Sequence, residues 1–137
     1  QVYVPLPTDV VVAKEFSNEA TALTKSMDQV EEDDLILDIG PETTNAYNEL
    51  IASARTIIWN GPVGVFEIEQ FSQGTAEIAK AIAANSGYKI VGGGDTVTVI
   101  EKYGISDSIS YVSTGGGAFL EFVKNGTLDA LEVLAQH

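Results

Sequence analysis

The chain is predicted to fold as an α/β domain with three layers, in which helices cover a Rossmann-like parallel sheet. Short apolar runs at residues 35–37, 56–59, 88–91 and 109–112 alternate with segments that have helical spacing. Such alternation with short connections is typical of parallel strands joined by right-handed crossovers. Glycine triplets follow the last two runs, at the carboxyl ends of strands where folds of this class bind ligands.

Four apolar runs are predicted to be strands, and three of them have the composition of buried strands. The runs at 35–37, 56–59 and 88–91 are nearly continuous in apolar residues, as strands buried on both faces tend to be. Residues 8–13 are predicted to form one more short strand, and residues 14–34 a polar segment. That segment ends in an acidic cluster of Glu31, Glu32, Asp33 and Asp34. We interpret the cluster as a solvated loop, and a metal site is the alternative.

Three amphipathic stripes at three-to-four spacing predict helices between the strands. Their apolar members are, in order, Ala46, Tyr47, Leu50, Ile51 and Ala54; Ala76, Ala79, Ile82 and Ala83; and Val97, Ile100 and Tyr103. Expected helix starts are Pro41 with Glu42 and, later, Asp95. The expected ends are Gly87, Gly104 and Gly126.

Composition excludes several classes of function. The chain has 137 residues, 45% of them hydrophobic, which suits one domain with a core of its own. A net charge of −13 opposes binding to nucleic acid or to an anionic membrane, so neither is expected as a partner. With no membrane-spanning run and no signal peptide, a cytoplasmic location is expected. The chain opens inside an apolar run, which indicates processing or a piece of something longer.

The two glycine triplets carry most of the chemical information. Gly92, Gly93 and Gly94 precede Asp95 and Thr96, and the second triplet is Gly115, Gly116 and Gly117. Such a junction can be only a tight turn, with Asp95 as the N-cap of the following helix. Alternatively, its backbone amides form a phosphate cradle and Asp95 offers Mg²⁺ a hard oxygen ligand. The second triplet, beside the first, makes the cradle the better interpretation.

A third junction follows the run at 56–59. Residues 60–67 read Asn60, Gly61, Pro62, Val63, Gly64, Val65, Phe66 and Glu67, a rigid bend with a carboxylate at its end. Glu67 is either a surface acid or an acceptor for ribose hydroxyls. The chain has no cysteine, and its one histidine is the terminal His137, so no histidine-based catalytic or metal site can form. Glycine-rich backbone without a base suits phosphoryl transfer, where positioning and charge stabilisation dominate.

In these motifs the chain resembles the phosphoglycerate kinase family. The resemblance extends from about Leu6 to the C-terminus and is carried by residues 38–41, 59–67, 92–96 and 113–117, with Phe71, Gly74 and Thr75. It implies a monomeric, two-domain glycolytic enzyme that moves a phosphoryl group between 1,3-bisphosphoglycerate and ADP, giving 3-phosphoglycerate and ATP with Mg²⁺. Residues 1–127 would be part of its C-terminal nucleotide-binding domain. Residues 128–137 would be a tail that packs on the N-domain, which is absent here.

The resemblance also implies roles for individual residues. Asn60, Gly61, Pro62 and Val65 would line the nucleotide pocket, with Glu67 on the ribose. Asp95 would hold Mg-ATP or Mg-ADP through the metal, and Thr96 would lie beside the phosphates after Gly92, Gly93 and Gly94. The transferred phosphoryl group would face Gly115, Gly116 and Gly117.

The resemblance further implies that 3-phosphoglycerate binds to the N-domain, so we expect this piece alone to be inactive and to self-associate. Two other functions stay open from the residues themselves. One is a dinucleotide-binding domain of an oxidoreductase, although Val97 stands where its G-x-G-x-x-G motif needs glycine. The other is a non-catalytic interaction domain that kept the fold.

Overall fold

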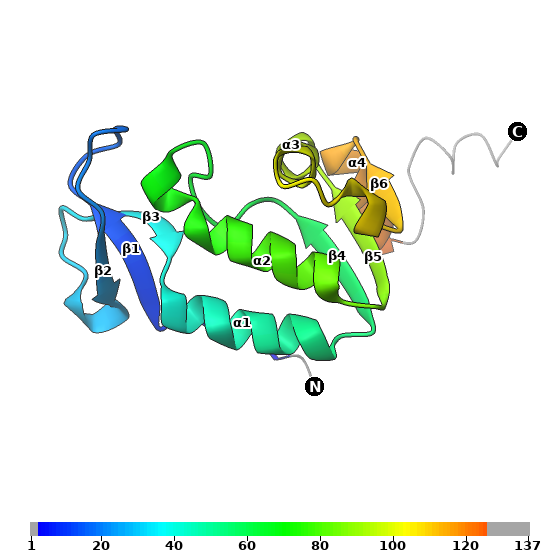
Figure 1. Cartoon of the computed structure of the whole chain (residues 1–137), viewed down its shortest axis with the longest axis horizontal. Helices are drawn as coiled ribbons and strands as arrows, with labels where there is room; N and C mark the ends of the chain where they lie inside the picture. The colour runs from blue at the N-terminus through cyan, green and yellow to red at the C-terminus, as the bar shows by residue number, and fades with distance from the viewer. Residues whose placement is uncertain (1–2, 126–137) are drawn as a thin grey trace, which may run out of the picture.

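The structure is a computed structural model that describes residues 3–125, and it contains two three-stranded sheets linked by helices (Figure 1). The strands are β1 Asp9–Ala13, β2 Leu23–Ser26, β3 Leu35–Ile39, β4 Thr56–Asn60, β5 Tyr88–Gly92 and β6 Tyr111–Ser113. The α-helices are α1 Pro41–Ser53, α2 Gln73–Ala84, α3 Gly94–Lys102 and α4 Gly116–Asn125. Short 3-10 helices occupy Met27–Gln29, Glu69–Phe71 and Ser106–Ser108.

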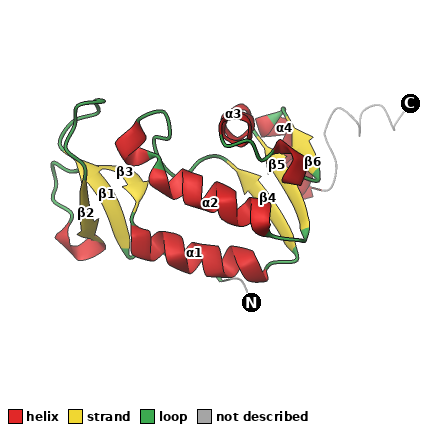
Figure 2. Cartoon of the chain, in the orientation of Figure 1, coloured by secondary structure: helices red, strands yellow, loops and turns green. Residues whose placement is uncertain are grey.

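The parallel sheet has the order β4-β5-β6 and confirms the predicted α/β class. Helices α1, α2 and α3 pack on one of its faces (Figure 2), around a core that includes Ile57, Trp59, Val91, Ile82 and Ile100. Helix α4 lies on the other face, where Phe119 occupies the space beside Gly92. The three predicted layers are therefore present at the carboxyl end of the sheet.

Two expectations about the strands are wrong. Elsewhere on the second face of the parallel sheet, Ile58 and Tyr88 are 50% and 54% exposed, so the strands at 56–59 and 88–91 are not buried on both faces. In addition, β3 does not join the parallel sheet. It pairs antiparallel with β1 in a second sheet of order β2-β1-β3, and β2 lies inside the polar segment at 14–34, where no strand was predicted. Local composition cannot select among distant pairing partners.

Helices α1 and α2 lie side by side and connect the two sheets (Figure 1). Each begins against a buried carboxylate of the antiparallel sheet. The Glu42 and Thr43 amides donate to Asp9 at 3.0 and 2.8 Å, and the Gly74 amide donates to Asp38 at 2.8 Å. Neither helix has a side-chain cap from its own N-cap residue, so these distant carboxylates satisfy its first amides.

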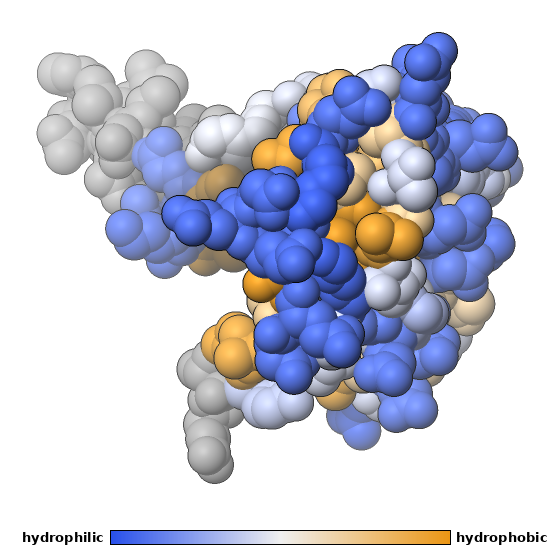
Figure 3. Space-filling model, turned by 90° about the vertical axis from the view of Figure 1, so that its left-hand side faces the viewer, coloured by the Kyte–Doolittle hydropathy of each residue, from blue (hydrophilic) through white to orange (hydrophobic). Residues whose placement is uncertain are grey.

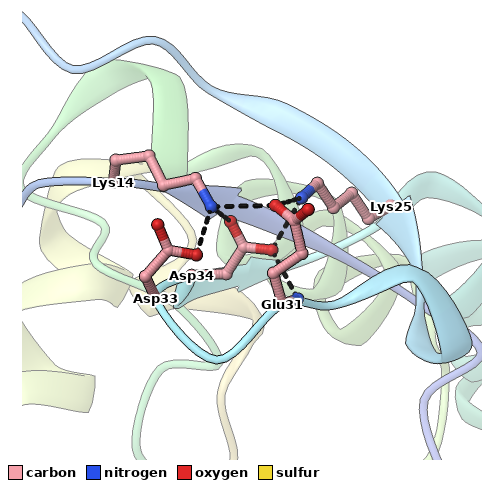
Figure 4. A network of polar contacts seen from close by, with 5 residues as sticks. All are labelled: Lys14, Lys25, Glu31, Asp33 and Asp34. Carbon is pink, nitrogen blue, oxygen red and sulfur yellow. Dashed lines mark hydrogen bonds and ion pairs between the residues drawn. The ribbon is translucent and has the colours of Figure 1, made fainter.

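The acidic cluster forms a loop, as predicted, but two lysines bridge it (Figure 4). Lys14 contacts Glu31, Asp33 and Asp34, and Lys25 contacts Glu31 and Asp34, at 2.7–3.0 Å. Hydrogen bonds from the lysines lower the pKa of all three carboxyls. The two ammonium groups offset part of the negative charge of these three carboxylates and occupy the positions where a cation would bind.

Hydrophilic residues cover most of the face on the antiparallel-sheet side, with apolar surface between them (Figure 3). Among the described residues, no helix is long and apolar enough to cross a membrane. The predicted tail at 128–137 and the helix end at Gly126 lie outside the described residues.

Candidate functional site

The three glycine-containing junctions meet at one end of the parallel sheet. The register aligns Asn60 with Gly92 and Gly92 with Ser113, so β4, β5 and β6 end side by side. The Gly93 amide donates to the Ser113 carbonyl oxygen at 3.2 Å. A Cβ on Gly116 would lie 3.5 Å from the Gly93 Cα, so the two glycine triplets are in contact. The predicted pairing of the two junctions is confirmed.

Helices α3 and α4 begin at these triplets, at Gly94 and Gly116. Gly93 has φ +92°, a conformation that side-chain-bearing residues rarely adopt, and this lets the chain turn directly from β5 into α3. The first turns of both helices therefore present unpaired amides and positive dipole ends from neighbouring strand ends. This is a backbone arrangement suited to an anion.

Asp95 is not the N-cap of α3, contrary to one interpretation of the sequence. Gly93 holds that position and makes no side-chain cap bond. Asp95 lies in the first turn with its side chain exposed, and among the described residues it receives no hydrogen bond. Asp95 lies two positions after the N-cap, so its carboxylate does not cap the helix and is free to meet a ligand.

Thr96 connects two of the three junctions. Its side chain is fully buried, and its Oγ1 accepts the Gly61 amide at 2.7 Å. Gly61 has φ +106°, and its carbonyl oxygen accepts the Trp59 Nε1–H at 2.8 Å. Asn60 is exposed, and its Oδ1 would lie 3.4 Å from a Cβ on Gly93. Four predicted site residues, Asn60, Gly61, Gly93 and Thr96, are thus brought together.

Three hydrogen bonds to its backbone hold the rest of the 60–67 loop in place. The Val63 amide donates to Thr75 Oγ1 at 3.3 Å, and the Val65 amide to the Leu37 carbonyl oxygen at 2.9 Å. Lys102 donates from Nζ to the Phe66 carbonyl oxygen at 2.7 Å and lies 5.5 Å from the centroid of the Phe66 ring. Sequence reasoning missed the role of Lys102 because its partner is a backbone oxygen 36 residues away.

A groove of about 330 Å³ runs beside this loop. Pro62 and Val65, two of the predicted pocket residues, line it together with Ile36 and Leu37 of β3. Its apolar side chains suit a planar base more than a charged group. Glu67 is exposed beyond the groove and receives no hydrogen bond from the described residues, so its predicted role on the ribose stays a prediction.

All seven basic side chains lie in the described part of the chain, and none belongs to the three junctions. An anion bound there would meet backbone amides and helix dipoles from this chain, and no lysine or arginine of the loops themselves. The site is built for close backbone contact.

Comparison with known proteins agrees with this geometry. A family model described as phosphoglycerate kinase matches residues 1–126. The phosphoglycerate kinase structure from Coxiella burnetii is 52% identical, with a TM-score of 0.88 over 96% of this chain and 34% of that one. The phosphoglycerate kinase structure from Pyrococcus horikoshii OT3 is 37% identical, with a TM-score of 0.78 over 94% of this chain and 32% of that one. The chain thus spans about a third of the length of these relatives, and it belongs to the phosphoglycerate kinase family.

Proposed function

We propose that this chain supplies part of the nucleotide site of a phosphoglycerate kinase. The reaction is reversible phosphoryl transfer between 1,3-bisphosphoglycerate and ADP, giving 3-phosphoglycerate and ATP in glycolysis, in the cytoplasm. The meeting of three glycine-containing junctions at the ends of β4, β5 and β6 carries the proposal. Family membership favours it over the dinucleotide-binding alternative, because the match covers residues 1–126.

Each junction has a part in this proposal. The groove beside Pro62 and Val65 takes the base, and Glu67 accepts hydrogen bonds from the ribose. The phosphates lie on the first turn of α3, where Gly93 and Gly94 leave the backbone open to close approach, whereas Gly92 at the end of β5 faces Phe119. The transferred phosphoryl group faces Gly115, Gly116 and Gly117 at the start of α4, whose amides stabilise the charge that develops in the transition state.

The residues present fit a magnesium-bound nucleotide, Mg-ATP or Mg-ADP. Asp95 is an exposed carboxylate in the first turn of α3 and is not engaged by other described residues. Mg²⁺ is commonly held by one or two carboxylates together with substrate phosphates and water. Bound there, the ion would neutralise phosphate charge, which the junctions do not do with basic side chains of their own.

The chemistry needs no general base from this chain. The acceptor in the direction of ATP consumption is a carboxylate, which is ionised at neutral pH. The protein must instead hold donor and acceptor in line in a water-poor cleft. We assign binding of 3-phosphoglycerate to the N-domain of the family's two-domain enzymes.

Titration with Mg-ADP tests the proposal. We expect amide chemical shifts to change at Gly92–Thr96 and Gly115–Gly117, in preference to the antiparallel sheet. Unchanged shifts at saturating nucleotide would favour a non-catalytic interaction domain.

The chain alone is predicted to show no turnover with Mg-ATP and 3-phosphoglycerate, because a closed cleft needs both substrates held in line. A coupled assay checks this expectation, with preparations from a host that lacks its own phosphoglycerate kinase. Measurable activity would mean that this chain also binds the acceptor.

A further inference from the structure

Asp38 lies where the antiparallel sheet, helix α2 and the 60–67 loop meet. Its side chain is 2% exposed. Oδ1 accepts the Ile39 amide at 2.9 Å, and Oδ2 accepts the Gly74 amide at 2.8 Å. The carboxylate therefore caps α2 from β3, and no lysine or arginine pairs with it in the described structure.

The 60–67 loop rests on the same carboxylate through Gly64. A Cβ on Gly64 would lie 2.4 Å from Asp38 Oδ1 and 2.9 Å from the Leu37 carbonyl oxygen, so a side chain fits only if something moves. The next residue, Val65, donates its amide to that Leu37 oxygen at 2.9 Å. Two consecutive residues of β3 thus support two consecutive residues of the loop.

We infer that Asp38 is a positioning residue of the nucleotide site, which holds the 60–67 loop against the start of α2. Thr75, one residue after the Gly74 amide that Asp38 accepts, binds the Val63 amide of the same loop at 3.3 Å. A shift of the carboxylate therefore moves both supports of the loop together. The consequence for nucleotide binding rests on the proposed function, whereas the loop's position can be measured without a ligand.

Asp9 provides a matched control. It is also buried, at 5% exposure, and caps α1 through the Glu42 and Thr43 amides. No hydrogen bond in the described structure joins Asp9 or α1 to the 60–67 loop. Asp9→Asn and Asp38→Asn each turn a buried acceptor into a donor that faces backbone amides, so both lower the stability of the fold. Only the second disturbs a support of the loop.

The first measurement is amide hydrogen exchange in the ligand-free protein. In Asp38→Asn, we expect Val63 and Val65 to exchange about tenfold faster or more relative to Val91 of the core strand β5. In Asp9→Asn the same ratio stays within about threefold of wild type. Equal ratios in the two variants would overturn the positioning role and leave Asp38 as a helix cap only.

The second measurement is calorimetric titration with Mg-ADP, well below the melting temperature of each variant. We expect about tenfold weaker binding in Asp38→Asn and little change in Asp9→Asn. Wild-type protein that binds no Mg-ADP would refute the proposed function, and hydrogen exchange would still decide the positioning role. Weaker exchange protection of the loop with unchanged affinity would overturn the link between loop and nucleotide.

Gly64→Ala tests the same contact with the carboxylate intact, should Asp38→Asn fail to fold. Its matched control is Gly40→Ala, whose Cβ would lie 2.2 Å from the Asp9 Cγ. The loop amides should lose protection in Gly64→Ala alone. Equal loss in both alanine variants would contradict the inference.

Discussion

At the scale of single residues, Asp95 gives the sharpest test of the proposed site. It is exposed in the first turn of α3 and makes no hydrogen bond with the described residues, so Asp95→Asn removes little that stabilises the fold. The lost interaction with the helix dipole is about 0.3–1 kcal/mol. We expect a nearly unchanged melting temperature and about tenfold weaker binding of Mg-ADP, measured by calorimetry.

Glu42→Gln serves as its control, because Glu42 is an exposed acid in the first turn of α1. Binding of ADP with the metal removed by chelator should differ little between Asp95→Asn and wild type. An equal loss of affinity with and without Mg²⁺ would contradict the metal-holding role of Asp95.

At the scale of elements, a buried hydroxyl joins α1 to the antiparallel sheet. Thr43 is 1% exposed, and its Oγ1 accepts the Thr8 and Asp9 amides at 3.0 and 3.1 Å. Thr43→Val would leave these amides without that acceptor, which costs about 2 kcal/mol in the free energy of unfolding. Urea denaturation measures this loss. The control is Thr98→Val, at an exposed position of α3, which should change the free energy of unfolding by less than about 0.5 kcal/mol.

The lysine–carboxylate network also acts on an element, since it ties the loop after Met27–Gln29 to Lys25 of β2 and to Lys14, the residue after β1. The pKa of Asp34 is lowered by hydrogen bonds from Lys14 and Lys25, so its stabilising contribution is present above its unfolded pKa of 3.8. That contribution is lost as pH falls through the lower folded pKa. The pKa of Glu31 and Asp33 shifts in the same direction, for the same reason.

We therefore expect the double variant Lys14→Met, Lys25→Met to melt at a lower temperature than wild type at pH 5–7. The two proteins should converge as the carboxylates become protonated in acid. Calorimetric melting from pH 7 to pH 2 checks this, with Lys80→Met, which breaks an exposed pair with Glu77, as the control. A constant difference at every pH would show that the lysines act through packing alone.

At the scale of the whole molecule, the exposed part of the parallel-sheet face that carries α4 bears on association. Ile58, Tyr88 and Tyr111 are 50%, 54% and 58% exposed, and β4 and β6 are the edge strands of that sheet. Exposed apolar faces and strand edges favour self-association. The net charge of −13 opposes close approach, and salt screens it over about 8 Å at physiological ionic strength.

We therefore expect the isolated chain to self-associate more strongly as salt is raised. Light scattering coupled to gel filtration measures the mass, and Ile58→Lys should shift the protein toward monomer. Leu50→Lys, at a 43% exposed position on α1, is the control. A monomer at every salt and protein concentration would refute this expectation. The tail at 128–137 lies outside the described residues, so this prediction rests on the sheet alone.

Local signals in the sequence were enough to predict the helices, the strand at 8–13 and the ends of the three parallel strands. Helix α1 begins at Pro41, as predicted, and Gly104, at φ +65°, follows the end of α3. The glycine triplets predicted the contact between the two junctions, because parallel strands of similar length end at one edge of a sheet. These features depend on residues only a few positions apart.

The tertiary structure alone decided which sheet β3 joins and what holds the 60–67 loop. Asp9 caps α1 from 34 residues away, Asp38 caps α2 from 36, and Thr96 binds Gly61 across 35. No periodicity or spacing marks these partners, because a hydrogen bond to a backbone amide requires no particular residue type from the donor. Only the tertiary packing of helices, strands and loops brings each acceptor to its amide.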